Sequence, residues 1–148
     1  AKTAAFALEP DMAVVVDATT AADTVGVPSD KQVCRAGGGP VVSFMDGRTL
    51  YDRPLYELIR SLADQEGIPN QTKTVVAGGN DAGAIQLTGA GCRVAATSRG
   101  GVRVAAISLP CRYLHSPACV LQEEDCRATA KLLKLLADGL CCGADGPR

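Results

Sequence analysis

The segment VRVAAISLPCRYLHSP, residues 102–117, decides how the rest of the chain is interpreted. A mainly apolar run is followed by a proline, a polar turn and His115, the only histidine of the sequence. This order is typical of a buried parallel strand that delivers a side chain to the carboxyl edge of its sheet. An imidazole there can be a metal ligand or a general base. The alternative is a histidine that only hydrogen-bonds within its loop.

A second apolar run, Met12–Val16, ends in the carboxylate of Asp17. A carboxylate at the end of a buried strand is costly unless it is paired or bound to metal. The alternative is an aspartate that caps the following turn, and Asp23 is a second candidate carboxylate in the same loop. Because Asp17 and His115 each follow a buried strand, we expect them to approach one another at the same edge of the sheet.

The remaining patterns alternate between strand and helix. Apolar residues recur every three or four positions from Pro54 to Glu66, with Asp52 as the expected cap and Gly67 as the expected end. Residues 1–8 resemble the end of a helix, and Glu123 begins the final one. The alternation predicts a three-layer α/β/α fold with a mainly parallel sheet. The expected strands are 12–17, 41–45, 72–77 and 102–108.

The turn Gly78-Gly79-Asn80-Asp81 joins the third expected strand to a helix start. Two glycines followed by Asn or Asp in this position resemble an anion-binding or substrate-binding turn. Asn80 and Asp81 are therefore candidate substrate contacts. The alternative is a tight turn in which one of them caps the helix.

Composition narrows the class of protein. The 148 residues are 47% hydrophobic with a net charge of -1, which fits one domain without the basic surface of a nucleic-acid-binding protein. No apolar run is long enough to span a membrane, and no signal peptide is recognisable. The seven cysteines are odd in number and contain no C-x-x-C pair, so we expect reduced thiols in a cytoplasmic protein.

Four motifs in order resemble one family. They are AKTAAFALEPDMAVVVDAT (1–19), GGGPVVSFMDG (37–47), AGGNDAGAIQLTGAG (77–91) and RYLHSP (112–117) after its apolar strand. Together they resemble the M42 family of di-metal aminopeptidases, the tetrahedral (TET) or glutamyl aminopeptidase group. The resemblance covers most of residues 1–140. It implies a zinc-peptidase-like fold, peptide substrates and assembly into homo-oligomers.

The resemblance also implies roles for individual residues. Asp17 and His115 match ligands of two divalent ions, zinc or cobalt, and Asn80, Asp81 and Arg112 match positions near the substrate. The family's other histidine, second aspartate, ligand glutamate and glutamate base have no match, and we expect them upstream. Residues 1–140 would then be the C-terminal portion of a catalytic domain that is inactive alone, with 141–148 as a disordered tail.

Two other functions remain open. The chain could be a non-catalytic interaction module of the same descent, or a glucan hydrolase, since some relatives have carried an endoglucanase name. Glucan hydrolysis needs two facing carboxylates, and no convincing pair is visible. One departure is the near-copy of GVRVAAIS (101–108) at GCRVAATS (91–98). We expect the second copy to be the sheet strand and the first an extra edge element.

Overall fold

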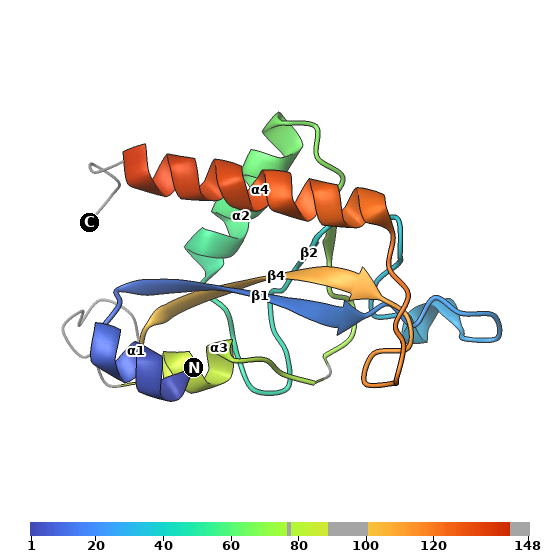
Figure 1. Ribbon diagram of the computed structural model, residues 1–148, viewed down its shortest axis with the longest axis horizontal. Coiled ribbons are helices and arrows are strands. Elements are labelled where there is room, and N and C mark those ends of the chain that lie inside the picture. Colours follow the sequence, from blue (N-terminus) through green and yellow to red (C-terminus); the bar gives the residue numbers. More distant parts are fainter. Residues whose placement is uncertain (77, 89–100, 143–148) are drawn as a thin grey trace.

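The computed structural model describes residues 1–76, 78–88 and 101–142, with no side-chain detail for 141 and 142. Its elements follow one another as shown in Figure 1. They are α1 (Lys2–Leu8), β1 (Met12–Thr20), the 3-10 turn η1 (Ser29–Lys31), β2 (Val41–Val42), α2 (Arg53–Gln65), β3 (Gln71–Thr72), α3 (Ala82–Gln86), β4 (Arg103–Cys111) and α4 (Glu123–Cys142).

The four described strands form one sheet in the order β1-β4-β2-β3. β1 and β4 run parallel and pair along their whole length, from Met12 opposite Arg103 to Thr20 opposite Cys111. β2 and β3 are also parallel to each other, but β2 is antiparallel to β4. The predicted α/β fold is confirmed, and the sheet is mixed.

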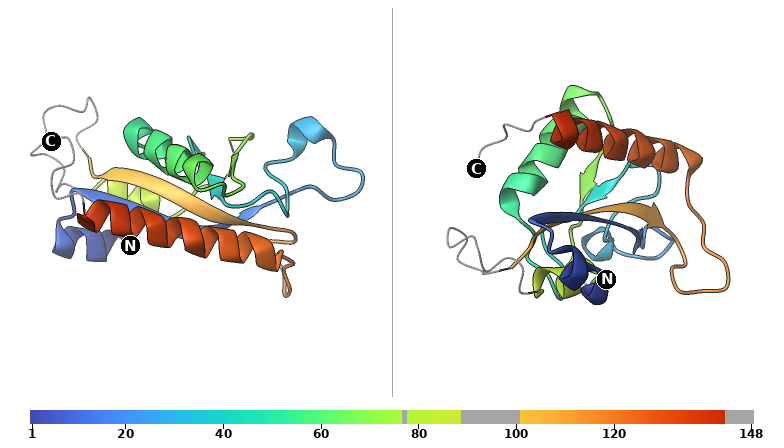
Figure 2. Two further views of the ribbon diagram at one scale, coloured as in Figure 1. Left: turned by 90° about the horizontal axis from the view of Figure 1, so that it is seen from above. Right: turned by 60° about the vertical axis from the view of Figure 1, so that its left-hand side comes forward.

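Helices cover both faces of the sheet. α2 and α4 lie on one face, and α1 and α3 lie on the other (Figures 1 and 2). Successive side chains of β4 alternate between the two layers: Ala105 and Ile107 belong to the core under α2 and α4, whereas Val104 and Ala106 pack with Tyr51 in the core beside α3. This burial on both faces explains why the strand is apolar at nearly every position.

α2 matches its prediction to within one residue. The Asp52 carboxylate accepts a hydrogen bond from the Leu55 backbone N–H at 3.0 Å, and Pro54 lies in the first turn. Leu55, Ile59 and Ala63 form the buried face. Gly67 follows the helix at a φ of 62°, a conformation that glycine adopts without strain.

The predicted strands 41–45 and 72–77 are much shorter in the structure, at 41–42 and 71–72. Local hydrogen bonds explain the difference. The Asp46 carboxylate accepts from the backbone N–H of Arg48 and Thr49, which forms a turn where the strand was expected to end. After β3, the Thr74 N–H donates to the Val33 carbonyl in a loop rather than to a strand.

The final helix is longer than expected, because α4 includes residues 141 and 142. Residues 143–148, the rest of the predicted tail, lie outside the described residues, as does the near-copy at 91–98. β4 confirms that the second copy is the sheet strand. None of the helices in the described part is long and apolar enough to cross a membrane.

Candidate metal and substrate site

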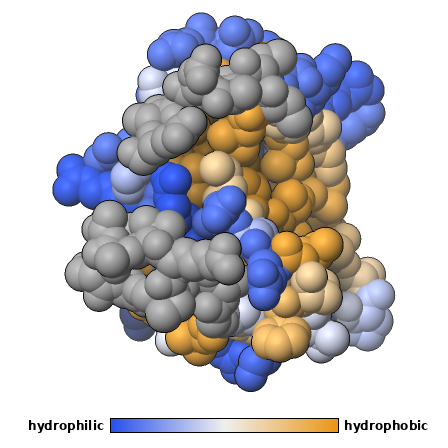
Figure 3. All heavy atoms as spheres, turned by 90° about the vertical axis from the view of Figure 1, so that its left-hand side faces the viewer, coloured by the Kyte–Doolittle hydropathy of each residue, from blue (hydrophilic) through white to orange (hydrophobic). Residues whose placement is uncertain are grey.

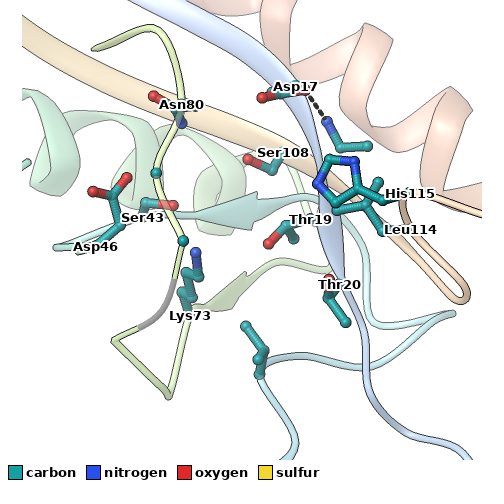
Figure 4. A pocket seen from close by; sticks show the side chains of 14 residues that line it. Asp17, Thr19, Thr20, Ser43, Asp46, Lys73, Asn80, Ser108, Leu114 and His115 are labelled. Carbon is teal, nitrogen blue, oxygen red and sulfur yellow. Dashed lines mark hydrogen bonds between the residues drawn. The ribbon is translucent and has the colours of Figure 1, made fainter. Parts of the chain in front are cut away.

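A pocket of about 280 Å³ opens where β1 and β4 end. Its lining combines residues from β1 and β4 with the loop after β4 and with the turns that precede α2 and α3. Asp17 and His115 lie on one wall, and Asp46, Lys73 and Asn80 lie on the opposite wall (Figure 4). The parallel pairing of β1 with β4 therefore brings the two predicted metal ligands to the same pocket.

Asp17 lies near the carboxyl end of β1, in register with the buried Ser108 of β4. Its side chain is exposed, and one carboxylate oxygen accepts a hydrogen bond from the Ala18 backbone N–H at 2.8 Å (Figure 4). This bond to its own neighbour fixes the orientation of the carboxylate at the pocket rim.

His115 lies in a short chain reversal after β4. Arg112 and Val120 exchange two backbone hydrogen bonds across its base, at 2.8 and 3.1 Å. Within the reversal, Tyr113 and His115 adopt φ angles of 62° and 64°. This left-handed conformation costs a non-glycine residue roughly 1–2 kcal/mol. The hydroxyl of Ser116 donates to the Tyr113 carbonyl at 2.6 Å and helps to hold the loop.

Asp46 on the opposite wall is a buried carboxylate that the sequence analysis did not identify. It accepts hydrogen bonds from the N–H groups of Arg48 and Thr49, both at 2.8 Å, and from the Tyr51 hydroxyl at 2.5 Å. Burial, and then this hydrogen bond, raise the pKa of Tyr51 well above its ordinary value. Both carboxylate oxygens of Asp46 thus accept hydrogen bonds from groups of the protein itself. Its place directly after a predicted strand was the signal that could have found it.

Of the two predicted residues in the glycine turn, only Asn80 lines the pocket. Its side-chain oxygen accepts from the Ala82 N–H at 2.9 Å, which caps the start of α3. Asp81 is exposed, makes no side-chain cap and does not line the pocket. Lys73 lines the pocket from the segment after β3 and was not predicted.

Arg112 also lies outside the pocket lining. Its guanidinium donates to both carboxylate oxygens of Asp23, at 2.7 and 2.9 Å. The hydrogen bond from Arg112 is the main reason that the pKa of Asp23 is lowered. Asp23 also accepts from the Ala36 N–H at 3.0 Å. This pair ties the loop after β1 to the end of β4.

Asp17 and His115 supply an oxygen and a nitrogen, the donor types that zinc binds in hydrolytic sites. Such sites use three protein ligands and leave one position open. Within residues 1–76, 78–88 and 101–142, no three His, Cys, Asp or Glu side chains converge in a way that could hold a metal ion. The two residues therefore fit part of a metal site and need further ligands to complete it.

Comparison with known proteins identifies relatives along nearly the whole chain. The profile of the M42 glutamyl aminopeptidases matches residues 1–132. A relative from Acetivibrio thermocellus is 35% identical over 141 residues, which are 95% of this chain and 38% of that protein. The chain thus spans little more than a third of its relatives' length.

Solved structures agree with this assignment. An aminopeptidase from the archaeon Desulfurococcus kamchatkensis superposes with a TM-score of 0.81 at 32% identity, covering 91% of this chain and 36% of that one. The TET1 peptidase of Pyrococcus horikoshii, which can assemble into a tetrahedron or a large octahedral shell, has a TM-score of 0.65 at 28% identity, covering 92% and 37%. With matching motifs, fold and profile, this chain belongs to the M42 glutamyl aminopeptidase family.

Proposed function

We propose that the chain is the C-terminal part of the catalytic domain of a di-metal aminopeptidase that removes N-terminal residues from peptides. Family membership supports the reaction class. The observation that carries the site assignment is the parallel pairing of β1 with β4, because it brings Asp17 and His115 to one pocket.

In this proposal Asp17 and His115 hold divalent metal ions, zinc or cobalt, together with ligands from another part of the protein. When bound, such a pair of ions polarises the scissile carbonyl and activates a water molecule. The protein orients both ligands in advance: the Ala18 N–H fixes the Asp17 carboxylate, and the base of the reversal fixes the His115 loop.

Asn80 is the residue we assign to the substrate, because it lines the wall opposite the proposed ligands (Figure 4). Its side-chain oxygen is used by the Ala82 N–H and its amide group also interacts with the Tyr51 hydroxyl, which leaves at most one amide N–H for a peptide carbonyl. Asp81 and Arg112 were candidates for the same role. Asp81 directly precedes α3 and Arg112 binds Asp23, so we propose neither of them as a substrate contact.

The open edge of β1 supports the idea that another part of the protein completes the domain. β1 is the terminal strand of the sheet, so one side of its backbone has no strand partner in the described residues. The α1 side chains Phe6 and Leu8 are 73% and 77% exposed, and Figure 3 shows extensive apolar surface on the side where α1 lies. An unpaired apolar edge of this kind is normally covered in a stable domain.

The proposal is tested with the 148-residue chain and with a chimera in which this chain replaces the matching segment of the Desulfurococcus kamchatkensis enzyme. Cobalt titration and hydrolysis of aminoacyl anilides are the measurements. We expect no turnover by the chain alone and metal-dependent turnover by the chimera. His115→Ala or Asp17→Ala should lower the chimera's turnover by at least about 100-fold, whereas Asp30→Ala, a change to an exposed aspartate that does not line the pocket, should not.

Two outcomes would contradict the proposal. Turnover by the chain alone that His115→Ala abolishes would show that the 148 residues contain a full site. A chimera that folds and assembles but is inactive would favour the non-catalytic interaction module. The glucan-hydrolase alternative is less well supported, because Asp46, the carboxylate that faces Asp17 across the pocket, already accepts three hydrogen bonds.

Self-association of the whole protein is a further part of the proposal. The Pyrococcus horikoshii relative can form closed shells, and we propose that the longer protein to which this chain belongs also forms homo-oligomers. Light scattering of the chimera and of the parent enzyme would compare their masses. A monomeric chimera from an oligomeric parent would place the assembly contacts within the replaced segment.

A further inference from the structure

Two cysteines flank the reversal that carries His115. Cys111 is the last residue of β4 and is completely buried, and Cys119 lies on the returning chain and is exposed. Both are free thiols. Neither has a role in the proposed peptidase site.

The backbone pairing places both thiols on one side of the reversal. Arg112 and Val120 form an antiparallel bridge with hydrogen bonds in both directions. Cys111 and Cys119 each precede a member of this pair, and their side chains therefore point to the face opposite Arg112 and Val120. Diagonal neighbours of this kind have Cα atoms roughly 7–8 Å apart.

The state of Cys111 agrees with this arrangement. Burial raises the pKa of the Cys111 thiol, and the neighbouring Cys119 thiol raises it further. The two sulfurs are thus close enough to influence one another. One is shielded from solvent and the other is open to it, so a soluble oxidant would meet Cys119 first.

A disulfide between them would change the reversal. Disulfides need Cα atoms about 4.4–6.8 Å apart, slightly closer than the diagonal spacing. The bond can form only if the two chain segments move together by about an ångström. His115 lies midway between the cysteines, in a loop whose backbone is already left-handed at Tyr113 and His115. Closing the bond should therefore move the imidazole.

We propose that Cys111 and Cys119 form a dithiol oxidation site whose disulfide repositions His115. Hydrogen peroxide is the oxidant. The Cys119 thiolate attacks one peroxide oxygen and the O–O bond breaks, which gives a sulfenic acid; the departing hydroxide takes up the proton that the thiol has lost and becomes the first water. The Cys111 sulfur then attacks the Cys119 sulfur, the S–O bond breaks, and a second water leaves as the S–S bond forms. The dithiol loses two hydrogens while the peroxide is reduced to two waters. The oxidation stands independently of the proposed peptidase, and only its effect on metal binding rests on that function.

Other described cysteines are poorer partners. Cys34 also lies near Cys111, but it is buried with its thiol 3.4 Å from the Thr20 carbonyl, and burial raises its pKa to about 12, so an oxidant in solution reaches the exposed Cys119 before it. Cys126 is half-buried in α4 and is not part of the reversal, which makes Cys126→Ser a matched control for Cys119→Ser.

The test uses the reduced 148-residue chain, treated with hydrogen peroxide and then blocked with N-ethylmaleimide. Trypsin cuts after Arg112, so the proposed bond would join the peptides 104–112 and 113–127. Further cleavage after Glu123 or Glu124 separates Cys119 from Cys126 and identifies the linked residue by mass. In parallel, proton NMR follows His115, whose imidazole gives the only histidine signal of the chain.

We expect the 111–119 link to be the first to form, with a shift of the His115 signal in the wild type and in Cys126→Ser but not in Cys119→Ser. A first link to any other cysteine, or Cys119 found only as an overoxidised acid, would overturn the site. A 111–119 link that leaves the His115 signal unchanged would overturn the coupling. Cobalt binding by the oxidised and the reduced chimera is then compared. If the chimera is inactive, the proposed peptidase function fails, but the disulfide found in the 148-residue chain still stands.

Discussion

β1 and β4 are neighbouring strands of nine residues each, yet they are buried to very different extents. They are parallel and in register over their full length, and both are dominated by small or branched apolar residues. β4 is buried at seven of its nine positions, whereas β1 is buried only at Thr19. In one register pair, Ile107 is 0% exposed and Val16 is 49% exposed. The difference comes from position: β4 lies between two strands, and β1 forms the edge.

An apolar strand sequence therefore indicates how much apolar surface a strand is able to bury, but not whether its neighbours cover that surface in a given chain. The neighbours of β4 cover its apolar surface within the described fold. β1 leaves most of that surface unburied among the described residues, which agrees with the proposal that more of the protein packs against this edge. Substitutions in and around the two strands test this contrast.

Removing the side chain of Ile107 should have the largest effect. Ile107→Ala deletes a fully buried side chain of the core under α2 and α4, and it should lower the free energy of unfolding by about 2–5 kcal/mol. Ile107→Val, which removes one methylene, should cost about 0.5–1.5 kcal/mol. Urea denaturation of both variants measures this. Equal small losses for both would mean that β4 is not the centre of the core.

The ion pair between Asp23 and Arg112 should matter less. Their side chains are 10% and 35% exposed, so Asp23→Asn should cost about 1–2 kcal/mol, between the values for surface and buried pairs. Because the folded pKa of Asp23 is lowered from its ordinary 3.8, its contribution is complete above that pH and is lost as the pH falls below it.

Thermal melts from pH 7 to pH 2.5 would check this sign. The stability difference between the wild type and Asp23→Asn should be constant near neutrality and should shrink only in the acid range. A difference that grows as the pH falls would show that Asp23 is not stabilised in its charged form.

The start of β4 is attached to α2 through Asp52, which caps the helix and binds the Arg103 guanidinium at 3.1 Å. Asp52→Ala should cost about 1–2 kcal/mol through the lost cap and the lost ion pair. Asp52→Asn keeps the cap and loses only the ion pair, whose hydrogen bonds of 3.2 and 3.1 Å are longer than the 2.7 and 2.9 Å bonds between Arg112 and Asp23, so it should cost less than about 1 kcal/mol. Similar losses for both changes, measured in urea, would assign the main effect to the ion pair instead.

Val16→Ala should have the smallest effect in the 148-residue chain. Its side chain is half exposed, so the expected loss is less than about 1 kcal/mol, although its register neighbour is Ile107. The same change in the chimera should cost more if this edge is covered there. An equal loss in chain and chimera would contradict the proposal that another part of the protein covers β1.

Several features were predictable from the sequence because their causes are local. Asp52, Pro54 and the apolar repeat of α2 define that helix within a few residues, and an apolar run followed by a polar turn predicted both long strands. The family motifs predicted Asp17 and His115 as metal ligands, and the parallel strands bring both side chains to one pocket. Their metal-binding role remains a prediction.

The rest depended on contacts between distant parts of the chain. The prediction that residues 43–45 and 73–76 continue their strands was wrong, because the turn at Asp46 and the hydrogen bond from the Thr74 N–H to the Val33 carbonyl take the backbone out of the sheet; residue 77 lies outside the described residues. Arg112 resembled a substrate contact in sequence, but Asp23, 89 positions earlier, takes its guanidinium.

Periodicity and capping act over a few residues, so the sequence was sufficient to locate α2, α4 and the two long strands. It did not give the strand ends, because β1 continues to Thr20 and β4 to Cys111, beyond the expected ends at 17 and 108. Only the tertiary structure decided the order β1-β4-β2-β3, the antiparallel direction of β2 and the wall of Asp46, Lys73 and Asn80 that faces the proposed ligands. These features depend on which apolar faces pack together across the whole chain. This is why Ile107 is buried and Val16 is half exposed, although both are branched apolar residues that lie opposite one another in the sheet.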